Sequence, residues 1–325
     1  MASYYYRLTT AKCFDYLKKE LDFINQNYEF CDSVFRKLSF LLHIAFWQGI
    51  FKLYRAIDVK FKKHTNGSFF IHNNKVEIEI TTECNMKCFH CDRSCRQAPS
   101  KECMTVAQIK HFVNESIEEN KKWPFIVIIG GEPTMHPDIY EICNILIDYK
   151  RNHSPNTKLT ISTNGVSRET KEVLANLPDI IHQENSSKTS IKNTQFFTFN
   201  VAPIDLEQYN QPGINFSNAC STASTAGSAL TRYGFYGCGA AASIDRVLGI
   251  DMGVKSLKDV TDKKYRTQFK VLCGYCGFFK SAEDDIYELE DMSPTWHKVY
   301  EDYKNKRPEL SLYGSNKIRP AALKT

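Results

Sequence analysis

Three closely spaced cysteines, Cys84, Cys88 and Cys91, form a C-x3-C-x2-C pattern. They follow residues 76–80, where apolar and acidic side chains alternate as in a β-strand. Three thiolates can bind three irons of a 4Fe–4S cubane and leave the fourth iron open to an exogenous ligand. A structural zinc site, which usually has four protein ligands, is the alternative, because Cys95 could supply the fourth thiolate. The loop therefore predicts a metal centre.

Two further polar motifs follow the next two predicted strands. They are Gly130-Gly131-Glu132-Pro133, after the apolar run at 125–129, and Ser162-Thr163-Asn164-Gly165, at the end of a strand predicted over 158–163. Paired glycines allow close approach to the backbone, and a carboxylate beside carbonyl groups can receive an ammonium group. Short polar side chains suit ribose hydroxyls or a carboxylate. Each motif alone is an ordinary turn. Their order at successive strand ends, where parallel α/β sheets bind ligands, predicts one shared pocket.

Strands and helices alternate from about residue 75 to 205, which predicts an α/β fold with a mostly parallel sheet or barrel. The expected strands are 76–80, 125–129, 158–163, 180–181 and 195–201, and the expected helices are 105–119, 137–149 and 168–176. Residues 1–62 show a helical pattern, whereas the Gly-, Ala- and Ser-rich stretch 217–242 fits no regular element without an organising ligand. We therefore expect three units: a helical extension (1–70), a core (71–212) and a C-terminal domain with its tail (213–325), of which the polar, basic end at 313–325 is expected to fray.

The composition is that of a globular protein, with 42% hydrophobic and 24% charged residues in 325, and it excludes disordered and collagen-like chains. A net charge of +5 is too small to indicate nucleic-acid binding. Residues 1–6 lack the pattern of a secretory signal, so we expect a reducing, cytoplasmic location in which cysteines bind metal. The apolar stretch 38–51 is too short to span a bilayer; we expect a helix that packs on the protein or a partner, in preference to membrane-surface attachment.

The cysteine loop and the Gly-Gly-Glu motif together resemble those of the radical S-adenosylmethionine (SAM) superfamily, over about residues 75–205. The resemblance implies a partial (β/α)6, TIM-like barrel and a 4Fe–4S cluster on Cys84, Cys88 and Cys91. It also implies that SAM binds the open iron through its amino and carboxylate groups. The cofactor-binding residues that it implies are Gly130, Gly131, Glu132 and Pro133 near the methionine amine, Ser162 and Asn164 near the ribose or carboxylate, and His90 beside adenine. His90 departs from the family pattern, which often has a hydrophobic aromatic residue there.

A second set of cysteines lies in the C-terminal region: Cys220, Cys238, Cys273 and Cys276. Four thiolates can fully ligate a second 4Fe–4S cluster or a structural zinc ion. This pattern resembles the auxiliary-cluster extension called SPASM, in its single-cluster form, the twitch domain. Its ligand order is similar to that of aminocyclitol dehydrogenases, which oxidise a secondary alcohol to a ketone.

The resemblance implies reductive cleavage of SAM, with electrons from a donor such as flavodoxin or ferredoxin, to a 5′-deoxyadenosyl radical. This radical would abstract hydrogen from a small polar substrate such as a sugar, aminocyclitol or nucleoside. A second cluster that accepts an electron favours a two-electron alcohol oxidation. The alternatives are an epimerase in which Cys95 or Cys103 donates hydrogen, and a peptide-modifying enzyme, although residues 1–62 show no winged peptide-recognition domain. A non-catalytic iron–sulfur or zinc scaffold would not need the two glycine-containing motifs.

The remaining polar and cysteine residues have simpler interpretations. Arg93 and Arg96 are expected to be solvated or to pair with a carboxylate or phosphate. Possible substrate contacts are Asp205, Tyr233, Arg246 and Asp251, for each of which a structural role is favoured. Cys13, Cys31 and Cys143 fall on helical patterns, which indicates buried small apolar residues.

Overall fold

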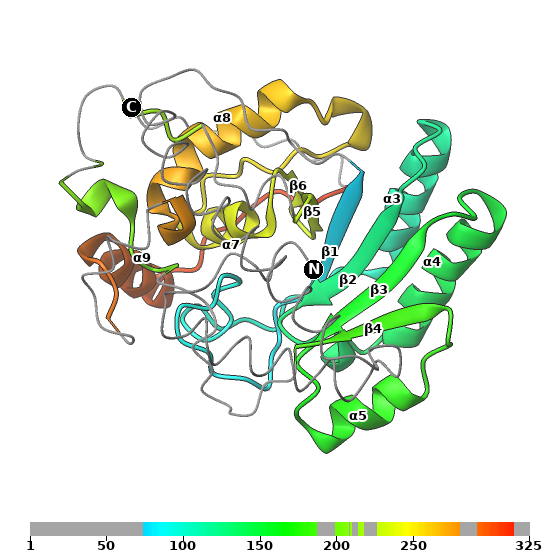
Figure 1. The fold of residues 1–325 in the computed structure, drawn as a ribbon. Coiled ribbons are helices and arrows are strands. Elements are labelled where there is room, and N and C mark those ends of the chain that lie inside the picture. Colours follow the sequence, from blue (N-terminus) through cyan, green and yellow to red (C-terminus); the bar gives the residue numbers. More distant parts are fainter. Residues whose placement is uncertain are drawn as a thin grey trace, which may run out of the picture.

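The computed structural model describes residues 74–186, 199–207, 209, 214–217, 226–279 and 291–314. Within them lies a six-stranded sheet of order β4-β3-β2-β1-β5-β6 (Figure 1). The strands are β1 (Lys75–Thr81), β2 (Phe125–Gly130), β3 (Lys158–Thr163), β4 (Ile181–Asn185), β5 (Ser228–Thr231) and β6 (Gly234–Tyr236). The first five pair in parallel and β6 pairs antiparallel with β5. The N-terminal helices, the apolar stretch 38–51, most of the strand expected at 195–201 and Cys220 fall outside the described residues.

Helices connect the parallel strands, as the alternating pattern predicted. The α-helices are α3 (Val106–Glu118), α4 (Ile139–Asn152), α5 (Arg168–Ala175), α7 (Gly239–Leu248), α8 (Asp262–Leu272) and α9 (Pro294–Asn305). Short 3-10 turns are η2 (Pro133–Met135), η3 (Pro203–Asp205), η4 (Leu257–Asp259), η5 (Cys273–Tyr275) and η6 (Gly277–Phe279). Helix α3 begins after Thr105, whose side chain forms a reciprocal capping box with Gln108 and so satisfies two backbone donors. None of the helices in these residues is long and apolar enough to cross a bilayer.

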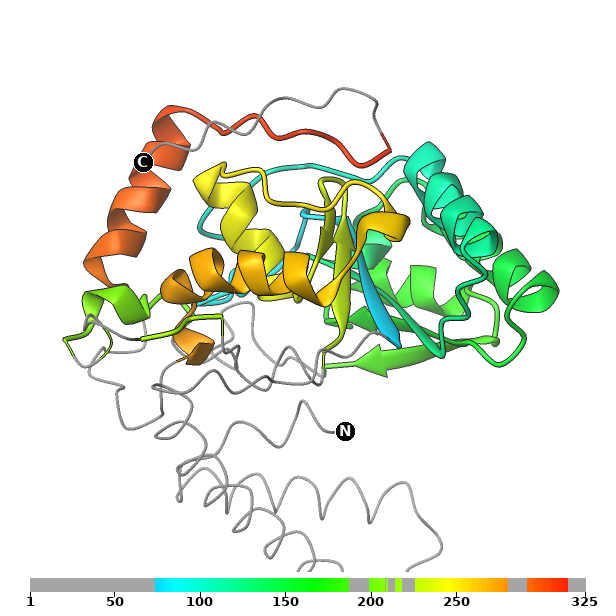
Figure 2. The same ribbon diagram turned by 90° about the horizontal axis from the view of Figure 1, so that it is seen from above.

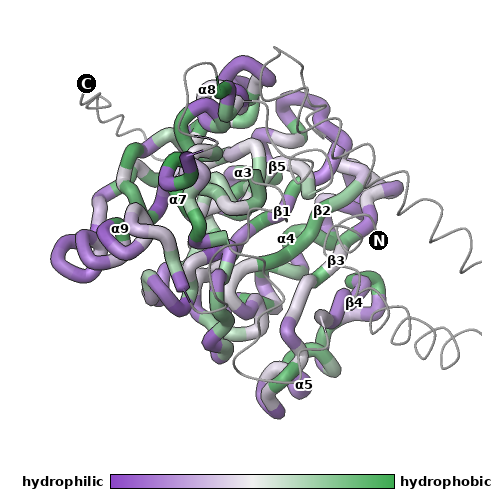
Figure 3. The backbone as a smooth tube through the Cα atoms, turned by 60° about the vertical axis from the view of Figure 1, so that its left-hand side comes forward, coloured by the Kyte–Doolittle hydropathy of each residue, from purple (hydrophilic) through white to green (hydrophobic). Residues whose placement is uncertain are grey.

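The main core includes residues of the sheet, of helices α3 and α4, which pack against each other on one side of it (Figure 2), and of α7, α8 and α9. Val76, Ile78 and Ile80 of β1 are fully buried there, beside Ile126 and Ile128 of β2. Figure 3 shows the hydrophobic residues of β2 at the centre and the mostly hydrophilic α9 at the periphery. Every second residue of β1 therefore faces this core, and Glu77 and Glu79 lie on the opposite face of the strand.

The sheet is open within the described residues, and its α/β class confirms the predicted fold class. One expectation was wrong: much of the stretch 217–242 is regular, because it contains β5, β6 and the start of α7. Residues Val76, Glu77 and Ile78 of β1 pair with β5, so the edge of an existing strand orders this part of the segment. The hairpin thus extends the sheet beyond β1. The unit boundaries at 70 and 212 stay predictions.

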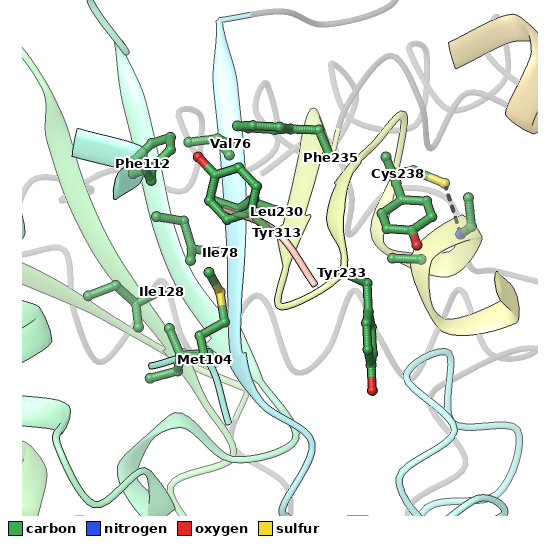
Figure 4. Close-up of a cluster of buried hydrophobic side chains, with 14 of the residues drawn as sticks. Val76, Ile78, Met104, Phe112, Ile128, Leu230, Tyr233, Phe235, Cys238 and Tyr313 are labelled. Atoms are coloured by element: carbon green, nitrogen blue, oxygen red, sulfur yellow. Dashed lines mark hydrogen bonds between the residues drawn. The ribbon is translucent and has the colours of Figure 1, made fainter. Parts of the chain in front are cut away.

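The segment after α9 crosses the molecule and ends beside α3 (Figure 2), where Tyr313 is 1% exposed. Its ring packs edge-on against Phe235, with the ring centres 5.5 Å apart (Figure 4), and its hydroxyl donates a hydrogen bond to Glu115. Gln108 donates a hydrogen bond to the Tyr313 carbonyl at 3.0 Å. Tyr313 therefore anchors this segment, and the expectation that fraying begins at residue 313 was wrong.

We expect Tyr313→Ala to lower the free energy of unfolding by about 3–5 kcal/mol, because it leaves a cavity and removes the donor to one oxygen of the buried Glu115 carboxylate. Urea denaturation followed by circular dichroism measures this loss. Leu312→Ala, at a neighbour that is 38% exposed, is the control and should cost less than about 1 kcal/mol. Equal losses in the two variants would contradict the anchoring role.

Candidate metal and cofactor site

The loop that carries Cys84, Cys88 and Cys91 leaves the C-terminal end of β1 and returns to it. The amide of Thr82 donates to the carbonyl of Glu102 at 2.9 Å, which closes the loop at its base. Cys88 and Cys91 are buried and Cys84 is half-buried, and none of the three forms a disulfide. With Met86 and Cys95 they make a small apolar cluster separate from the main core. The three predicted ligands are therefore held in one compact, water-poor loop.

Cys91 is the most constrained of the three. The residues on either side of its turn, His90 (φ 47°) and Ser94 (φ 51°), adopt left-handed backbone conformations that non-glycine residues rarely occupy. The Ser94 amide donates to the Cys91 carbonyl at 2.8 Å. A hydrogen bond from the Cys95 thiol lowers the pKa of the Cys91 thiol, whereas burial raises the pKa of Cys84 to about 12. A buried thiol such as Cys84 is deprotonated when metal coordination compensates its charge.

The arrangement fits a cubane better than a single ion. Within the described part of the chain, no three Cys, His, Asp or Glu side chains converge to hold one metal ion. Zinc needs such convergence, whereas the three cysteines of a cubane bind three different irons. Cys95, the candidate fourth zinc ligand, is hydrogen-bonded to Cys91 instead. Cys95 thus lies next to one predicted ligand, and the case against zinc is the lack of three converging side chains in the described residues.

The paired glycines bring the end of β2 directly against the cysteine loop. A Cβ atom on Gly131 would lie 2.3 Å from the Glu83 carbonyl oxygen and 2.9 Å from the Cys84 Cβ, so only glycine fits. The amide of Glu132 donates to the same Glu83 carbonyl at 2.8 Å. A Cβ on Gly130 would meet the Thr81 oxygen at 2.3 Å. Both glycines are thus required by close backbone packing, of Gly130 on the end of β1 and of Gly131 beside the first predicted ligand.

Glu132 is fully buried and joins the ends of β2 and β3. One carboxylate oxygen accepts hydrogen bonds from the hydroxyls of Thr134 and Thr163, both at 2.8 Å, and from the Thr134 amide at 3.2 Å. The other oxygen accepts from the Asn164 amide at 2.8 Å. Four donors fill most of the accepting capacity of a carboxylate. Glu132 therefore fixes the β3 end, and its contact with a methionine amine stays a prediction, as does that of Pro133, which is buried in η2.

Asn164 connects the third motif to the cysteine loop. Its side-chain amide donates to the Asn85 carbonyl oxygen at 2.7 Å, and its own oxygen accepts from the Val166 amide at 3.0 Å. Ser162 is half-buried and in register with Glu184 of β4. The structure therefore brings the cysteine loop and the ends of β2 and β3 together at one edge of the sheet.

His90 is buried, and its Nδ1 accepts a hydrogen bond from the Asn200 amide at 3.2 Å. Asn200 in turn donates to the Tyr300 hydroxyl of α9 at 2.6 Å. His90 thus ties the loop to the C-terminal region, a role that the sequence did not indicate. Its proximity to adenine stays a prediction.

Arg96 and Arg93 follow the two interpretations that the sequence left open: Arg96 is partly solvated, whereas Arg93 pairs with carboxylates. Arg96 is partly exposed and its guanidinium lies 4.2 Å from the centre of the Phe89 ring. Arg93 is buried and forms ion pairs with Glu77 at 2.8 Å and Glu79 at 3.4 Å, on the second face of β1. The only sequence signal for these pairs was the proximity of Arg93 to the loop, since the two acidic residues resemble a solvated strand face.

The four candidate substrate contacts all have structural roles, as favoured from the sequence. Asp205 accepts hydrogen bonds from Thr295 at the start of α9, and Asp251 accepts from Ser311 and pairs with Lys255. Tyr233 donates to Glu102, and Arg246 donates to backbone carbonyls of the cysteine loop.

Three of the four C-terminal cysteines are buried in the same core. Cys238 caps the N-terminus of α7, where its sulfur accepts from the Ala241 amide at 3.4 Å (Figure 4). Cys273 and Cys276 bracket η5 at the end of α8, a helix that contacts α7. Cys143 is fully buried in α4, in line with its predicted packing role, and Cys13, Cys31 and Cys220 fall outside the described residues.

Comparison with known proteins identifies the region that contains the site. Residues 78–182 match the model of the Radical SAM superfamily. The AdoMet-dependent heme synthase of Methanosarcina barkeri is 33% identical over 88 residues, which are 27% of this chain and 23% of that protein. The mycofactocin maturase MftC of Mycobacterium tuberculosis is 38% identical over 99 residues, 30% of this chain and 23% of the maturase. The chain thus spans about a quarter of the length of these relatives.

A similar solved structure is that of BtrN in complex with AdoMet and 2-DOIA. It is 16% identical, with a TM-score of 0.40, and the match covers 65% of this chain and 94% of that chain.

Proposed function

We propose that this chain, whose residues 78–182 match the Radical SAM superfamily model, cleaves SAM reductively to abstract hydrogen from a small polar substrate. The observation that carries the proposal is the joining of three motifs at one sheet edge. Gly131 packs on Cys84, Glu132 holds the β3 end, and Asn164 reaches back to Asn85 of the cysteine loop.

Each group of residues at the site has its own role in our proposal. Cys84, Cys88 and Cys91 hold a 4Fe–4S cluster, and the backbone at residues 130–133 with Ser162 and Asn164 binds SAM. When bound, the cluster and SAM supply a 5′-deoxyadenosyl radical that abstracts a hydrogen atom from the substrate. The chain itself holds the cofactors in place and excludes water from the cysteine loop. The burial of Cys88 and Cys91 supports this exclusion of water.

We assign the second cysteine set to a fully ligated 4Fe–4S cluster on Cys220, Cys238, Cys273 and Cys276. The shared burial of the last three on α7 and η5 supports this assignment. An electron acceptor beside the substrate favours net two-electron oxidation of an alcohol in a sugar, aminocyclitol or nucleoside. An external donor such as flavodoxin or ferredoxin would reduce the first cluster.

An epimerase, the alternative reaction, needs a thiol that reaches the substrate. Cys95 is enclosed with Cys91 and hydrogen-bonded to it, which argues against that role. Cys103 is half-exposed, and its thiol donates to the Thr81 hydroxyl at 3.3 Å. Cys103 is therefore the better candidate for the alternative.

Anaerobic reconstitution followed by turnover tests the proposal. We expect about eight irons per chain, SAM-dependent 5′-deoxyadenosine, and faster formation of it with one member of a panel of polyols and nucleosides. Deuterium transfer from that substrate into 5′-deoxyadenosine would locate the attacked carbon. About four irons would overturn the auxiliary cluster alone, and zinc without iron would overturn the whole proposal.

A further inference from the structure

Helix α7 connects the two cysteine sites physically. It begins at Cys238, and one face of it contacts the turn that follows Cys91. Gly239, Ser243 and Arg246 form that face, because positions i, i+4 and i+7 lie above one another on a helix. A Cβ on Gly239 would lie 1.6 Å from the Arg93 guanidinium, and the Ser243 hydroxyl is 3.1 Å from that of Ser94.

Arg246 makes the largest set of contacts on this face and is 3% exposed. One of its terminal nitrogens donates to the Ala98 carbonyl at 3.1 Å, and the other to the carbonyls of Arg93 at 3.2 Å and Ser94 at 3.4 Å. The Tyr303 hydroxyl of α9 lies 3.0 Å from the first nitrogen. Buried carbonyl groups need such donors, and a planar guanidinium can serve several of them at once.

The opposite side of the same turn is held by β1. Arg93 pairs with Glu77 and Glu79, and the apolar cluster encloses Cys91 with Cys95. The turn after Cys91 therefore lies between β1 on one side and α7 on the other. Helix α7 begins at Cys238, a predicted ligand of the second cysteine site. Any shift of α7 moves the donors of the turn that carries Cys91.

We propose that Arg246 positions the turn at residues 91–98, so that helix α7 couples ligation at Cys238 to the geometry of the first cysteine site. The inference rests on the proposed function, because both sites are taken to hold clusters. Ligation of Cys238 fixes the first turn of α7. Arg246, about 12 Å along a helix that rises 1.5 Å per residue, transmits that constraint to the Cys91 turn.

A matched pair of arginines separates positioning from general packing. Arg307 stacks on the same Tyr303 ring as Arg246 and donates to the Pro99 carbonyl of the same loop, but it is exposed and touches none of the three carbonyls that Arg246 holds. Arg307→Ala is therefore the control for Arg246→Leu. Arg246→Lys keeps a positive charge but not the planar fork, so we expect a partial effect.

The readout is the fraction of cluster whose electron paramagnetic resonance spectrum changes when SAM is added, because only a cluster with an open iron responds. In the full reconstituted chain we expect Arg246→Leu to lower this fraction about tenfold, Arg246→Lys to lie between Arg246→Leu and wild type, and Arg307→Ala to match wild type. Thermal melts by circular dichroism verify folding, and Arg246→Lys carries the test if the leucine variant does not fold. A wild-type response in Arg246→Lys and Arg246→Leu would overturn the proposal.

The coupling itself is tested by a double-mutant cycle. Cys276→Ala, which removes a predicted ligand of the second site, should lower the same fraction in the wild-type background and have little further effect with Arg246→Leu. Independent, multiplying effects would overturn the coupling. A wild-type protein without any SAM-responsive cluster would instead overturn the proposed function, so the two failures are distinguishable.

Discussion

Replacing Cys84 by alanine is expected to abolish SAM-dependent formation of 5′-deoxyadenosine, by at least about a thousandfold. The loss follows from ligand count, because two thiolates cannot hold three irons of a cubane and leave one open. Gly131 packs on the Cβ of Cys84, which alanine keeps, so the variant removes the thiolate and leaves the contact between the loop and the β2 end in place. Chromatographic quantification of 5′-deoxyadenosine in dithionite-reduced, reconstituted protein measures the effect.

Cys103→Ala is the matched control, because Cys103 belongs to the same loop, is half-exposed and lies at its base rather than among the ligands. This variant should cleave SAM at the wild-type rate if the reaction is an oxidation. Residual reductive cleavage in Cys84→Ala would mean that the three cysteines do not hold the reactive cluster. Iron analysis of the same variant should still find about four irons, those of the auxiliary cluster.

The ends of β1, β2 and β3 could be predicted as one site because each polar motif follows an apolar strand directly. Parallel strands place their carboxyl ends at one edge, so chain order alone brings Cys84, Glu132 and Asn164 together. The reason for the glycines could not be predicted. A Gly-Gly pair signals close approach but does not say whether a ligand or, as here, the protein's own backbone approaches.

Glu77 and Glu79 show why the ion pairs under the cysteine loop could not be predicted from the sequence. Their alternation with apolar residues is typical of a strand with one solvated face, yet both are buried. The cause is distant in the chain: the turn after Cys91 folds back over β1 and brings Arg93 with it. Burying two carboxylates is unfavourable unless a cation pairs with them, and no local pattern names the pairing residue.

The hairpin of β5 and β6 was missed for a similar reason. Its four-residue strand, Ser228–Thr231, is too short and too mixed in composition to show a period. The strand forms because the edge of β1 offers a row of hydrogen-bonding groups and because Leu230 and Phe235 complete the core under α3. Such pairing over about 150 residues of chain depends on tertiary structure that sequence periodicity does not carry.

Glu132→Ala is expected to lower the free energy of unfolding by about 3 kcal/mol or more and to weaken SAM binding at least about a hundredfold. The variant leaves four donors, from Thr134, Thr163 and Asn164, without an acceptor in a fully buried site. It also frees Asn164 from the β2 end and so loosens its bond to Asn85. Urea denaturation measures the stability loss, and equilibrium dialysis with labelled SAM measures the affinity.

Two milder variants separate the loss of stability from the loss of SAM affinity. Each of them changes the hydrogen bonds of a different carboxylate oxygen of Glu132. Thr134→Val removes one donor to the oxygen that Thr163 also contacts, and should cost about 1 kcal/mol with little change in SAM affinity. Glu132→Gln can turn its amide nitrogen toward the Asn164 amide, where two donors then face each other, so affinity should fall more than stability. If Glu132→Gln bound SAM as tightly as wild type, the Glu132–Asn164 contact would serve the fold alone. The β3 end would then have to be held at the cysteine loop by the Asn85–Asn164 bond without help from β2.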